Sequence, residues 1–180
     1  MKPIPFNNTY INLGEDFYVR AAPTPVANPE LVIFNQALGE ALGLSDTCLN
    51  SAGSAAILAG NHFPEGADAV AMAYAGPQFG HFVPQLGDGR ALLLGQLAGP
   101  DGVQHDIHLK GSGRTAFSRG GDGRAALGPV LREYLVSEAM AALYVPTTRA
   151  LAAATTGEQV VRQEYLPGGV ITRTARSFVR

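Results

Sequence analysis

Apolar residues recur at helical spacing in the first third of the chain and predict two helices there. Residues 1–26 contain four prolines and are expected to be irregular. A helix is predicted to begin at Asn28, because asparagine caps helices and Pro29 then occupies the first helical position, which suits proline. Its apolar stripe consists of Leu31, Phe34, Leu38 and Leu42. Residues 51–58 are rich in alanine and predict a second, weaker helix.

From residue 85 onward, the pattern changes to short runs separated by turn residues, which is typical of strands. Residues 85–97 predict a β-hairpin whose turn lies at residues 87–90. In the next strand, residues 105–110, Ile107 and Leu109 share one face. The opposite face carries Asp106, His108 and Lys110. We therefore expect a half-buried strand that ends in a lysine.

A glycine-rich segment follows this strand. Residues 111–128 contain six glycines and three arginines, which predicts a loop that is mobile or shaped around a ligand. A helix is predicted over residues 127–143, and three more strands are predicted at 148–154, 159–165 and 169–174, separated by glycine-containing turns. The chain is therefore expected to have an α+β fold with a largely antiparallel sheet. The hairpin spacing argues against a doubly wound parallel sheet.

Composition narrows the class of protein. The 180 residues suit one domain, or one lobe of a larger protein. The single cysteine, Cys48, excludes an internal disulfide and a multi-cysteine zinc site. No apolar run approaches the roughly 20 residues that span a bilayer, and residues 1–6 lack the apolar core of a secretion signal. We expect a soluble protein of a reducing compartment.

Charge is distributed unevenly along the chain. Residues 1–109 hold three basic and ten acidic residues, whereas residues 110–180 hold ten basic and five acidic ones. The second part therefore favours an anionic partner. Bulk nucleic-acid binding is not expected, because there is no lysine- or arginine-rich tail. Lys110 is conspicuous, since the chain has only two lysines against eleven arginines.

The surroundings of Lys110 suggest a nucleotide site. A glycine-rich turn precedes it, and its backbone N–H groups can approach phosphate closely. The lysine supplies a point charge to the phosphates, and a glutamate on the following helix can hold it, as in protein kinases. A helical wheel favours Glu138 as that glutamate, because it lies near the apolar face, and Glu133 is then solvated. A helix buried on two sides could place either glutamate inside. The alternative is that Lys110 is a solvated strand end.

Other motifs are weaker. No Walker phosphate loop is present. Residues 111–116 match the dinucleotide fingerprint G-x-G-x-x-A, but Ser118 to Gly121 follow where a helix should run, which disfavours a Rossmann domain. His105 and His108 would lie on opposite faces of a strand, which disfavours a metal site. Three arginines near the end of the chain are either contacts for anionic oxygens or a solvated face: Arg173, Arg176 and Arg180.

Several short runs are distinctive together. They are residues 74–82 (YAGPQFGHF), 85–90 (QLGDGR), 109–115 (LKGSGRT), 117–124 (FSRGGDGR) and 146–151 (PTTRAL). Over residues 8–180 they closely resemble the selenoprotein O family. Pro77, Ala116 and Tyr144 depart from the pattern of that family.

This resemblance implies a protein-kinase-like fold and protein adenylyltransferase activity. Such enzymes bind ATP in a flipped orientation and transfer AMP to the hydroxyls of Ser, Thr or Tyr in proteins. The resemblance implies that Lys110 pairs with Glu133 rather than Glu138. It also implies that the nucleotide contacts are Gly87, Gly89, Arg90, Lys110, Asp122, Gly123, Arg173 and Arg180, with Arg173 and Arg180 at the γ-phosphate.

The resemblance also sets the expected domain organisation. Residues 1–70 are expected to form a helical extension packed on a nucleotide-binding N-lobe of residues 71–180. The family's catalytic Asp and its ligands for Mg²⁺ or Mn²⁺ belong to a second lobe, and no aspartate follows Asp122 here. The chain is therefore expected to be a cytoplasmic, bacterial N-terminal portion, inactive by itself, with ATP and proteins as partners and no membrane or nucleic acid. The alternative function is a non-catalytic ATP-binding scaffold.

Overall fold

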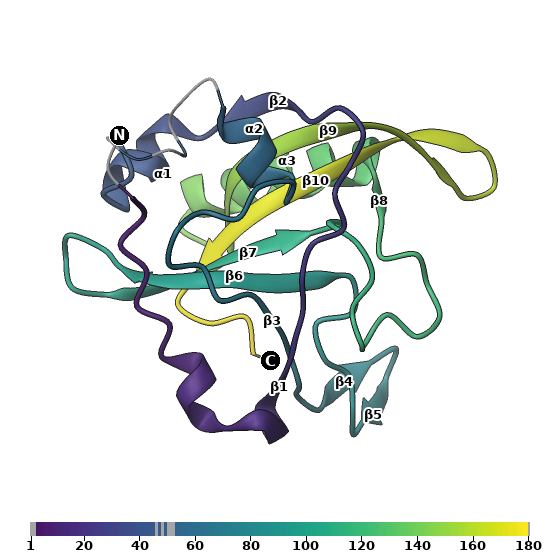
Figure 1. The fold of residues 1–180 in the computed structure, drawn as a ribbon, viewed down its shortest axis with the longest axis horizontal. Helices are drawn as coiled ribbons and strands as arrows, with labels where there is room; N and C mark the ends of the chain where they lie inside the picture. Colours follow the sequence, from purple (N-terminus) through teal and green to yellow (C-terminus); the bar gives the residue numbers. More distant parts are fainter. Residues whose placement is uncertain (1–2, 46, 48, 50–52, 180) are drawn as a thin grey trace.

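A computed structural model describes residues 3–45, 47, 49 and 53–179 (Figure 1). The predictions that concern Cys48 and Arg180 lie outside the described residues.

One antiparallel sheet organises the fold. Its strand order is β1-β3-β6-β7-β10-β9-β2, and β8 pairs with β10 beside that path. The strands are β1 (Tyr18–Arg20), β2 (Glu30–Phe34), β3 (Val70–Met72), β6 (Ala91–Ala98), β7 (Gln104–Lys110), β8 (Ala125–Ala126), β9 (Arg149–Val161) and β10 (Tyr165–Ala175). Every described pairing between them is antiparallel. The predicted α+β fold with a largely antiparallel sheet is confirmed.

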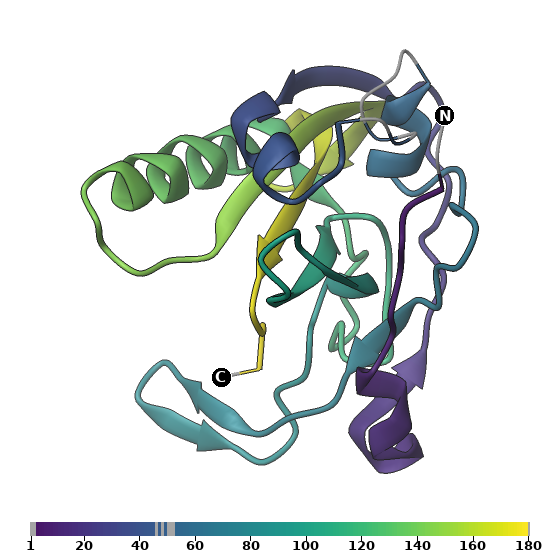
Figure 2. The same ribbon diagram turned by 90° about the vertical axis from the view of Figure 1, so that its left-hand side faces the viewer.

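Helices and a small hairpin complete the molecule. The helices are α1 (Gln36–Ala41), α2 (Ser54–Leu58) and α3 (Leu127–Ala142), with 3₁₀ turns η1 (Tyr10–Leu13) and η2 (Glu15–Phe17). The strands β4 (Gly76–Gln78) and β5 (His81–Val83) form a separate two-stranded hairpin that projects from the body of the molecule (Figure 2). No described helix is long and apolar enough to cross a bilayer.

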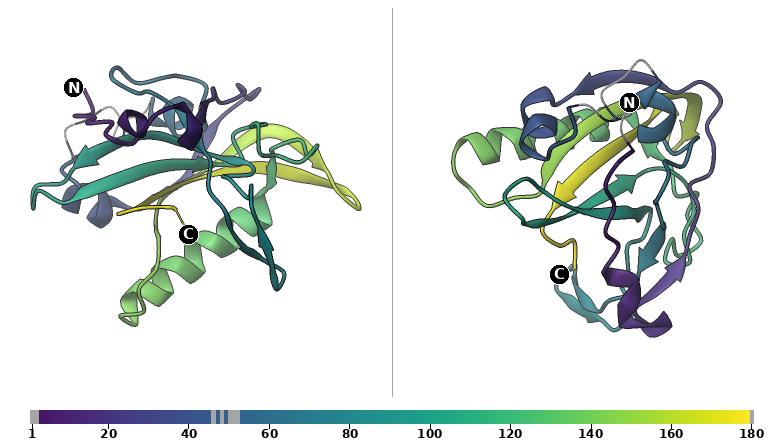
Figure 3. Two further views of the ribbon diagram at one scale, coloured as in Figure 1. Left: turned by 90° about the horizontal axis from the view of Figure 1, so that it is seen from below. Right: turned by 60° about the vertical axis from the view of Figure 1, so that its left-hand side comes forward.

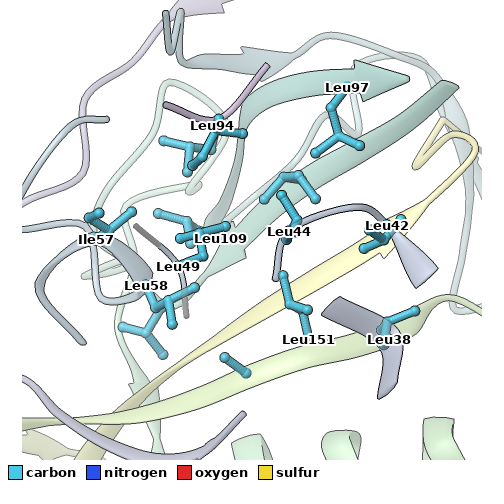
Figure 4. Packing of buried hydrophobic residues seen from close by; sticks show 14 of the residues in the cluster. Leu38, Leu42, Leu44, Leu49, Ile57, Leu58, Leu94, Leu97, Leu109 and Leu151 are labelled. Atoms are coloured by element: carbon cyan, nitrogen blue, oxygen red, sulfur yellow. The ribbon is translucent and has the colours of Figure 1, made fainter. Parts of the chain in front are cut away.

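The sheet is covered on both faces. On one face, leucines and isoleucines from α1, α2, β6, β7 and β9 point toward one another (Figure 4). On the other face, Val130 and Tyr134 of α3 pack against Ala150, Ala153 and Ile171. Neighbouring residues of one strand contribute to opposite layers, as the alternation of side chains along a strand requires. Figure 3 shows α3 on one side of the sheet and the N-terminal segment on the other.

Strand β7 confirms the predicted alternation but is buried on both faces. Ile107 and Leu109 are fully buried in the larger core, as expected. Asp106 and His108, on the polar face, are each only 2% exposed, so the strand is not half-buried. The additional cover comes from Phe178, whose ring stacks on His108 beyond the end of β10. Sequence periodicity could not anticipate this cover, because Phe178 is distant in sequence.

The helix predicted from Asn28 is wrong in its first half. Residues 30–34 form the edge strand β2, which pairs with β9. Helix α1 starts only after Asn35, whose side chain accepts a hydrogen bond from the Leu38 N–H. The physical reason is tertiary: β9 presents an open edge, and Val32 and Ile33 are β-branched residues that suit a strand. Leu38 lies in α1 as predicted, and Leu42 lies directly at the end of that helix. Both belong to the larger core, as expected.

Two strand predictions also need correction. Residues 85–90 form a loop instead of half a hairpin, because the N–H groups of Leu86 and Gly87 donate to the Tyr74 carbonyl. Strand β6 instead forms its hairpin with β7. The three strands predicted after residue 147 are two, since Gly157 lies inside β9 and Pro167 lies inside β10 at a register shift. A register shift in the pairing of β9 with β10 accommodates these residues within the strands, whereas the local sequence pattern predicts a turn at each of them.

Residues before position 70 contribute more than helices. Strands β1 and β2 lie at the two ends of the main sheet, and α1 and α2 cover its larger core.

The predicted helix over residues 127–143 is confirmed as α3, and the alanine-rich helix is confirmed over residues 54–58. Together these elements fix β7, α3 and β10 around one polar site.

Candidate functional site

Lys110 and Glu133 form an ion pair at the end of β7. The Lys110 Nζ lies 2.6 Å from the Glu133 Oε2, and the two side chains are 26% and 29% exposed. Register places Lys110 between Ala91 of β6 and Ile171 of β10, so the backbone beneath it is a central strand of the sheet. Burial lowers the pKa of Lys110, and the nearby Arg173 lowers it further, whereas Glu133 opposes both. Lys110 is therefore not a freely solvated strand end.

Glu133 has a second cationic partner. The Arg173 Nη1 lies 3.0 Å from the Glu133 Oε1, so one carboxylate bridges two cations. Burial alone raises the pKa of Glu133, but the hydrogen bond from Lys110 and the charge of Arg173 outweigh it and leave that pKa lowered. One negative charge between two positive charges leaves a net positive site, which attracts an anion.

Glu138 serves a different purpose. Its carboxylate accepts hydrogen bonds from the Arg149 Nε at 2.9 Å and Nη2 at 2.7 Å. It also accepts from the Asn35 side chain at 2.7 Å and the Ala150 N–H at 2.8 Å. The helical wheel placed Glu138 on the inward side of α3, but its partner there is Arg149 and not Lys110. The two glutamates differ because the sheet presents a different cation to each.

A cleft of about 590 Å³ opens beside Lys110. One wall is the loop at residues 86–90, and the other is the glycine-rich segment at residues 118–124. Six of the residues singled out from the sequence line it: Gly87, Gly89, Arg90, Lys110, Asp122 and Gly123. Arg119, Arg124 and Arg162 add further positive charge to the lining. The cleft therefore combines glycine-rich backbone with cationic side chains.

Hydrogen bonds tie the two walls together. The Ser118 hydroxyl donates to the Gly89 carbonyl at 2.8 Å, and the Thr115 hydroxyl donates to the same carbonyl. Gly87 has a φ of +58°, and a Cβ there would lie 2.3 Å from the Phe117 ring. Gly123 has a φ of +72°, and a Cβ there would lie 2.0 Å from the Gly113 carbonyl oxygen. These contacts require glycine and hold the segment in one shape.

The arginines of the glycine-rich segment mainly bind the protein itself. Arg124 donates to the carbonyls of Thr24 and Pro25, and Arg119 donates to the Gln78 side chain. Arg114 donates to the Gly121 carbonyl at 2.8 Å. The segment is therefore an ordered loop whose shape its own side chains maintain.

Asp122 lies at the rim of the cleft beside Arg162. The Arg162 Nη1 and Nη2 lie 2.7 and 3.1 Å from the Asp122 carboxylate oxygens. The hydrogen bond from Arg162 lowers the pKa of Asp122. Arg162 comes from the turn between β9 and β10, and sequence reasoning missed it because that turn was assigned to a strand.

A second cavity of about 350 Å³ lies on the other side of Lys110. Arg173 and His108 line it, whereas Lys110 and Asp88 line both cavities. Arg173 is thus brought to the site by β10, but Arg176 is exposed beyond the end of that strand. The two cavities therefore share Lys110 and Asp88 in their linings.

Asp88, His108 and Phe178 belong to this site and were missed as functional candidates. Asp88 lies in the loop at residues 86–90, and His108 lies two residues before Lys110 on the same strand face. That shared face was the available signal, but His108 was considered only as a metal ligand. Among the described residues, no group of His, Cys, Asp or Glu side chains is arranged to hold a metal.

The segment after Gly111 does not form a dinucleotide site of the Rossmann type. Residues 111–124 fold into a loop with a bridge between Ser112 and Arg124, and no described helix begins until Leu127. The sheet around it is antiparallel. The fingerprint needs a helix N-terminus directly after the glycines to bind pyrophosphate, and that element is missing from this position.

Comparison with known proteins settles the family. The family described as "Protein adenylyltransferase SelO" matches residues 2–180 of the chain. The chain belongs to the SelO family. A SelO relative from Rhodopseudomonas palustris (strain BisB5), named "Protein nucleotidyltransferase YdiU", is 64% identical over 176 residues. Proteins of the same name from Bradyrhizobium sp. (strain ORS 278) and Alkalilimnicola ehrlichii are 63% and 60% identical.

These SelO relatives are much longer than the chain. Each alignment covers 98% of the chain but 36% of the relative. The chain therefore spans about a third of the length of the curated relatives it matches.

Proposed function

We propose that this chain is the nucleotide-binding part of a protein adenylyltransferase, which transfers AMP from ATP to Ser, Thr or Tyr hydroxyls of proteins. The observation that carries the proposal is the pair of cavities that meet at Lys110, whose ammonium group lies 2.6 Å from Glu133. Membership of the SelO family supports the choice of reaction. Together, the charge of the site and the family favour ATP as the ligand.

The charges lining the cavities suit a polyphosphate. Lys110 supplies a compact positive charge, and guanidinium groups such as those of Arg90 and Arg173 match phosphate oxygens in two-point hydrogen bonds. Glycines at positions 87 and 89 let backbone N–H groups approach phosphate without a side chain between them. A neutral ligand would leave the excess positive charge of these groups, beyond what Glu133 offsets, without compensation.

The arrangement of the two cavities supports a flipped nucleotide. Arg173 lines the cavity behind Lys110, so we assign it to the terminal phosphate. Arg180 is assigned to the same phosphate only because the resemblance to the family implies it. Asp122 and Gly123 line the cleft but not the cavity that contains Arg173, and we assign them to the nucleoside end. This orientation leaves the α-phosphate, rather than the γ-phosphate, accessible to a protein hydroxyl.

The chemistry proposed is one displacement at phosphorus. A protein hydroxyl oxygen bonds to the α-phosphorus, the bond to the bridging oxygen of pyrophosphate breaks, and a base accepts the hydroxyl proton. In this chain, Lys110, Arg90 and Arg173 neutralise charge and position the nucleotide.

The remaining groups are proposed to lie outside this chain. No described cluster of side chains fits a divalent metal, so ligands for Mg²⁺ or Mn²⁺ are assigned to the remainder of a longer protein. The catalytic aspartate is assigned there too, because no aspartate follows Asp122. We further propose a cytoplasmic location in a bacterium, with a kinase-like arrangement of this lobe.

The decisive experiment labels ATP at different phosphates. A full-length protein should label target proteins from ATP carrying ³²P at the α position and not from ATP labelled at the γ position. Lys110→Ala should reduce this labelling about a hundredfold, as loss of one charge-stabilising donor typically does. His105→Leu, on the same strand but away from both cavities, is the matched control.

Label that appears only from γ-labelled ATP would overturn the proposal in favour of a kinase. ATP binding without any transfer would instead support a non-catalytic ATP-binding scaffold.

A further inference from the structure

A chain of buried polar groups runs behind Lys110 and ends at Arg173. It begins with Asp88 in the loop at residues 86–90, passes through His108 on β7 and reaches Arg173 on β10. The side chains of Asp88 and His108 are 1% and 2% exposed, and that of Arg173 is 14% exposed. Burying three polar side chains is costly unless each is paired, so their mutual contacts need an explanation.

The contact between Arg173 and His108 fixes the position of the imidazole proton. The Arg173 Nη2 lies 2.7 Å from the His108 Nδ1. A guanidinium group can only donate, so Nδ1 must accept, and the hydrogen of the neutral ring is on Nε2. Burial lowers the pKa of His108, which agrees with a neutral ring.

Asp88 holds the other side of the imidazole. The His108 Nε2 lies 3.2 Å from the Asp88 Oδ2, an electrostatic contact that is not aligned as a hydrogen bond. Asp88 is itself anchored, because it accepts hydrogen bonds from the Met72 N–H at 2.9 Å and the Tyr74 hydroxyl at 3.3 Å. The carboxylate therefore favours the tautomer that leaves Nδ1 free to accept from Arg173.

Phe178 fixes the planes of both side chains. Its ring stacks on the His108 ring at 4.2 Å between centroids and 14° between planes. The Arg173 guanidinium carbon lies 4.7 Å from the same ring centroid, within the range of a cation–π interaction. With Glu133 accepting from Nη1, the guanidinium is held from three directions.

The held guanidinium also lines the cavity behind Lys110, and its Nε has no hydrogen-bond partner among the described residues. An arginine side chain free to rotate would sample many orientations, and ordering it on binding costs free energy. A guanidinium that is already oriented avoids that cost.

We propose that His108 is a positioning residue, whose Nδ1 acceptor and anchoring by Asp88 orient Arg173 toward the terminal phosphate of the nucleotide. This inference rests on the proposed function for the identity of the ligand. It assigns His108 an effect on nucleotide affinity that acts through Arg173 and not by direct contact with the reacting atoms.

The test compares three substitutions in a full-length protein by equilibrium binding of ATP and by steady-state kinetics. His108→Leu removes the acceptor and should weaken ATP binding about tenfold, the cost of one hydrogen bond to a charged group. The KM for ATP should rise with kcat changed less than about twofold, because ground-state and transition-state binding lose the same interaction.

Two amide substitutions separate positioning from packing. His108→Asn places a carbonyl oxygen at the position of Nδ1 and should restore most of the affinity. His108→Gln places its amide one bond further, toward Asp88, and should not restore it. If His108→Leu fails to fold, this pair still decides, with His105→Leu as the control on the same strand. Nitrogen-15 NMR should show the His108 hydrogen on Nε2.

The outcomes separate this inference from the proposed function. Unchanged ATP affinity in His108→Leu, or equal affinity in the two amide variants, overturns the positioning role even when AMP transfer occurs. Weaker ATP binding in His108→Leu without AMP transfer by the wild type supports the positioning role and overturns the proposed function. No ATP binding by the wild type overturns both.

Discussion

Glu133 and Glu138 lie five positions apart on α3 and bind different cations. Glu133 bridges Lys110 and Arg173, which line the cavities, whereas Glu138 joins α3 to Arg149 and the Ala150 N–H at the start of β9. Under the proposed function the first set positions charge for the nucleotide, whereas the second holds helix and sheet together. These roles predict that replacing each glutamate by glutamine affects a different property: ATP affinity for Glu133 and stability for Glu138.

Glu133→Gln should weaken ATP binding about tenfold or more, because Lys110 and Arg173 lose the carboxylate that holds both in position for the phosphates. Glu138→Gln should leave ATP affinity unchanged and lower the free energy of unfolding by about 1–2 kcal/mol, after allowing for partial exposure. Isothermal titration calorimetry and urea unfolding measure the two effects. Equal losses of ATP affinity in the two variants would contradict the division of roles.

The pKa of Glu138 predicts how stability changes in acid. Burial raises this pKa, but hydrogen bonds from Arg149 and the Ala150 N–H outweigh it and leave it below the ordinary value of 4.5. A carboxyl with a lowered folded-state pKa stabilises the fold above the unfolded-state pKa and loses that contribution as pH falls. Stability should therefore decrease below about pH 4.5.

His108 adds to the same trend at higher pH. Burial lowers its pKa from the ordinary 6.5, so below that pH the unfolded chain takes up a proton that the folded chain resists. Asp106 opposes the trend, since burial raises its pKa above 3.8. Urea midpoints from pH 7 to 3 should fall in the wild type and fall less steeply in Glu138→Gln. Parallel curves would show that Glu138 is not the group responsible.

At the scale of elements, the glycine-rich segment depends on close backbone approaches. A Cβ at position 123 would lie 2.0 Å from the Gly113 carbonyl oxygen, and backbone cannot move aside as a flexible side chain can. Gly120 has a similarly positive φ of +78°, but no atom lies within 4 Å of the position a Cβ would take. The two glycines therefore share the conformational requirement and differ only in the steric one.

Gly123→Ala should lower the free energy of unfolding by about 2–4 kcal/mol, since both left-handed strain and a backbone clash apply. It should also weaken ATP binding, because the segment forms one wall of the cleft. Gly120→Ala carries only the strain, about 1–2 kcal/mol. Thermal unfolding and ATP titration measure both effects, and equal destabilisation by the two substitutions would refute the steric account.

At the scale of the whole molecule, α3 has two unlike sides. Val130 and Tyr134 are buried against the sheet, whereas Leu135, Val136 and Leu143 beyond the helix end are exposed. The chain spans about a third of the length of its curated relatives. The proposed nucleotide site would need groups from two lobes, because metal ligands and a base must face the lysine.

The 180-residue chain alone is therefore expected to bind ATP weakly and to transfer no AMP. Incubation with α-labelled ATP and a mixture of acceptor proteins should give no labelled protein, while the full-length protein labels them. Robust turnover by the isolated chain would show that the base and metal ligands are not confined to the rest of the protein.

Local sequence determined much of this protein. The alternation of residues 105–110 predicted β7, and the run from Leu127 predicted α3, because both signals depend on neighbours within one element. The expectation of an antiparallel sheet was correct, although the hairpin predicted at residues 85–97 was wrong and β6 pairs with β7 instead. Family motifs singled out six residues that share one cleft, although periodicity alone pointed to Glu138 rather than Glu133.

Only the tertiary structure decided the features that join distant segments. Residues 30–34 became a strand because β9 offers an open edge more than 100 positions away. Glu133 and Glu138 were assigned their partners by the strands that α3 lies across, which a helical wheel cannot represent. The buried contacts of Asp88, His108, Arg173 and Phe178 join three separate segments: the loop at residues 86–90, β7, and β10 with the residues that follow it. Burial and pairing of charges are properties of the assembled fold, and for this reason the sequence could nominate Arg173 but not reveal what orients it.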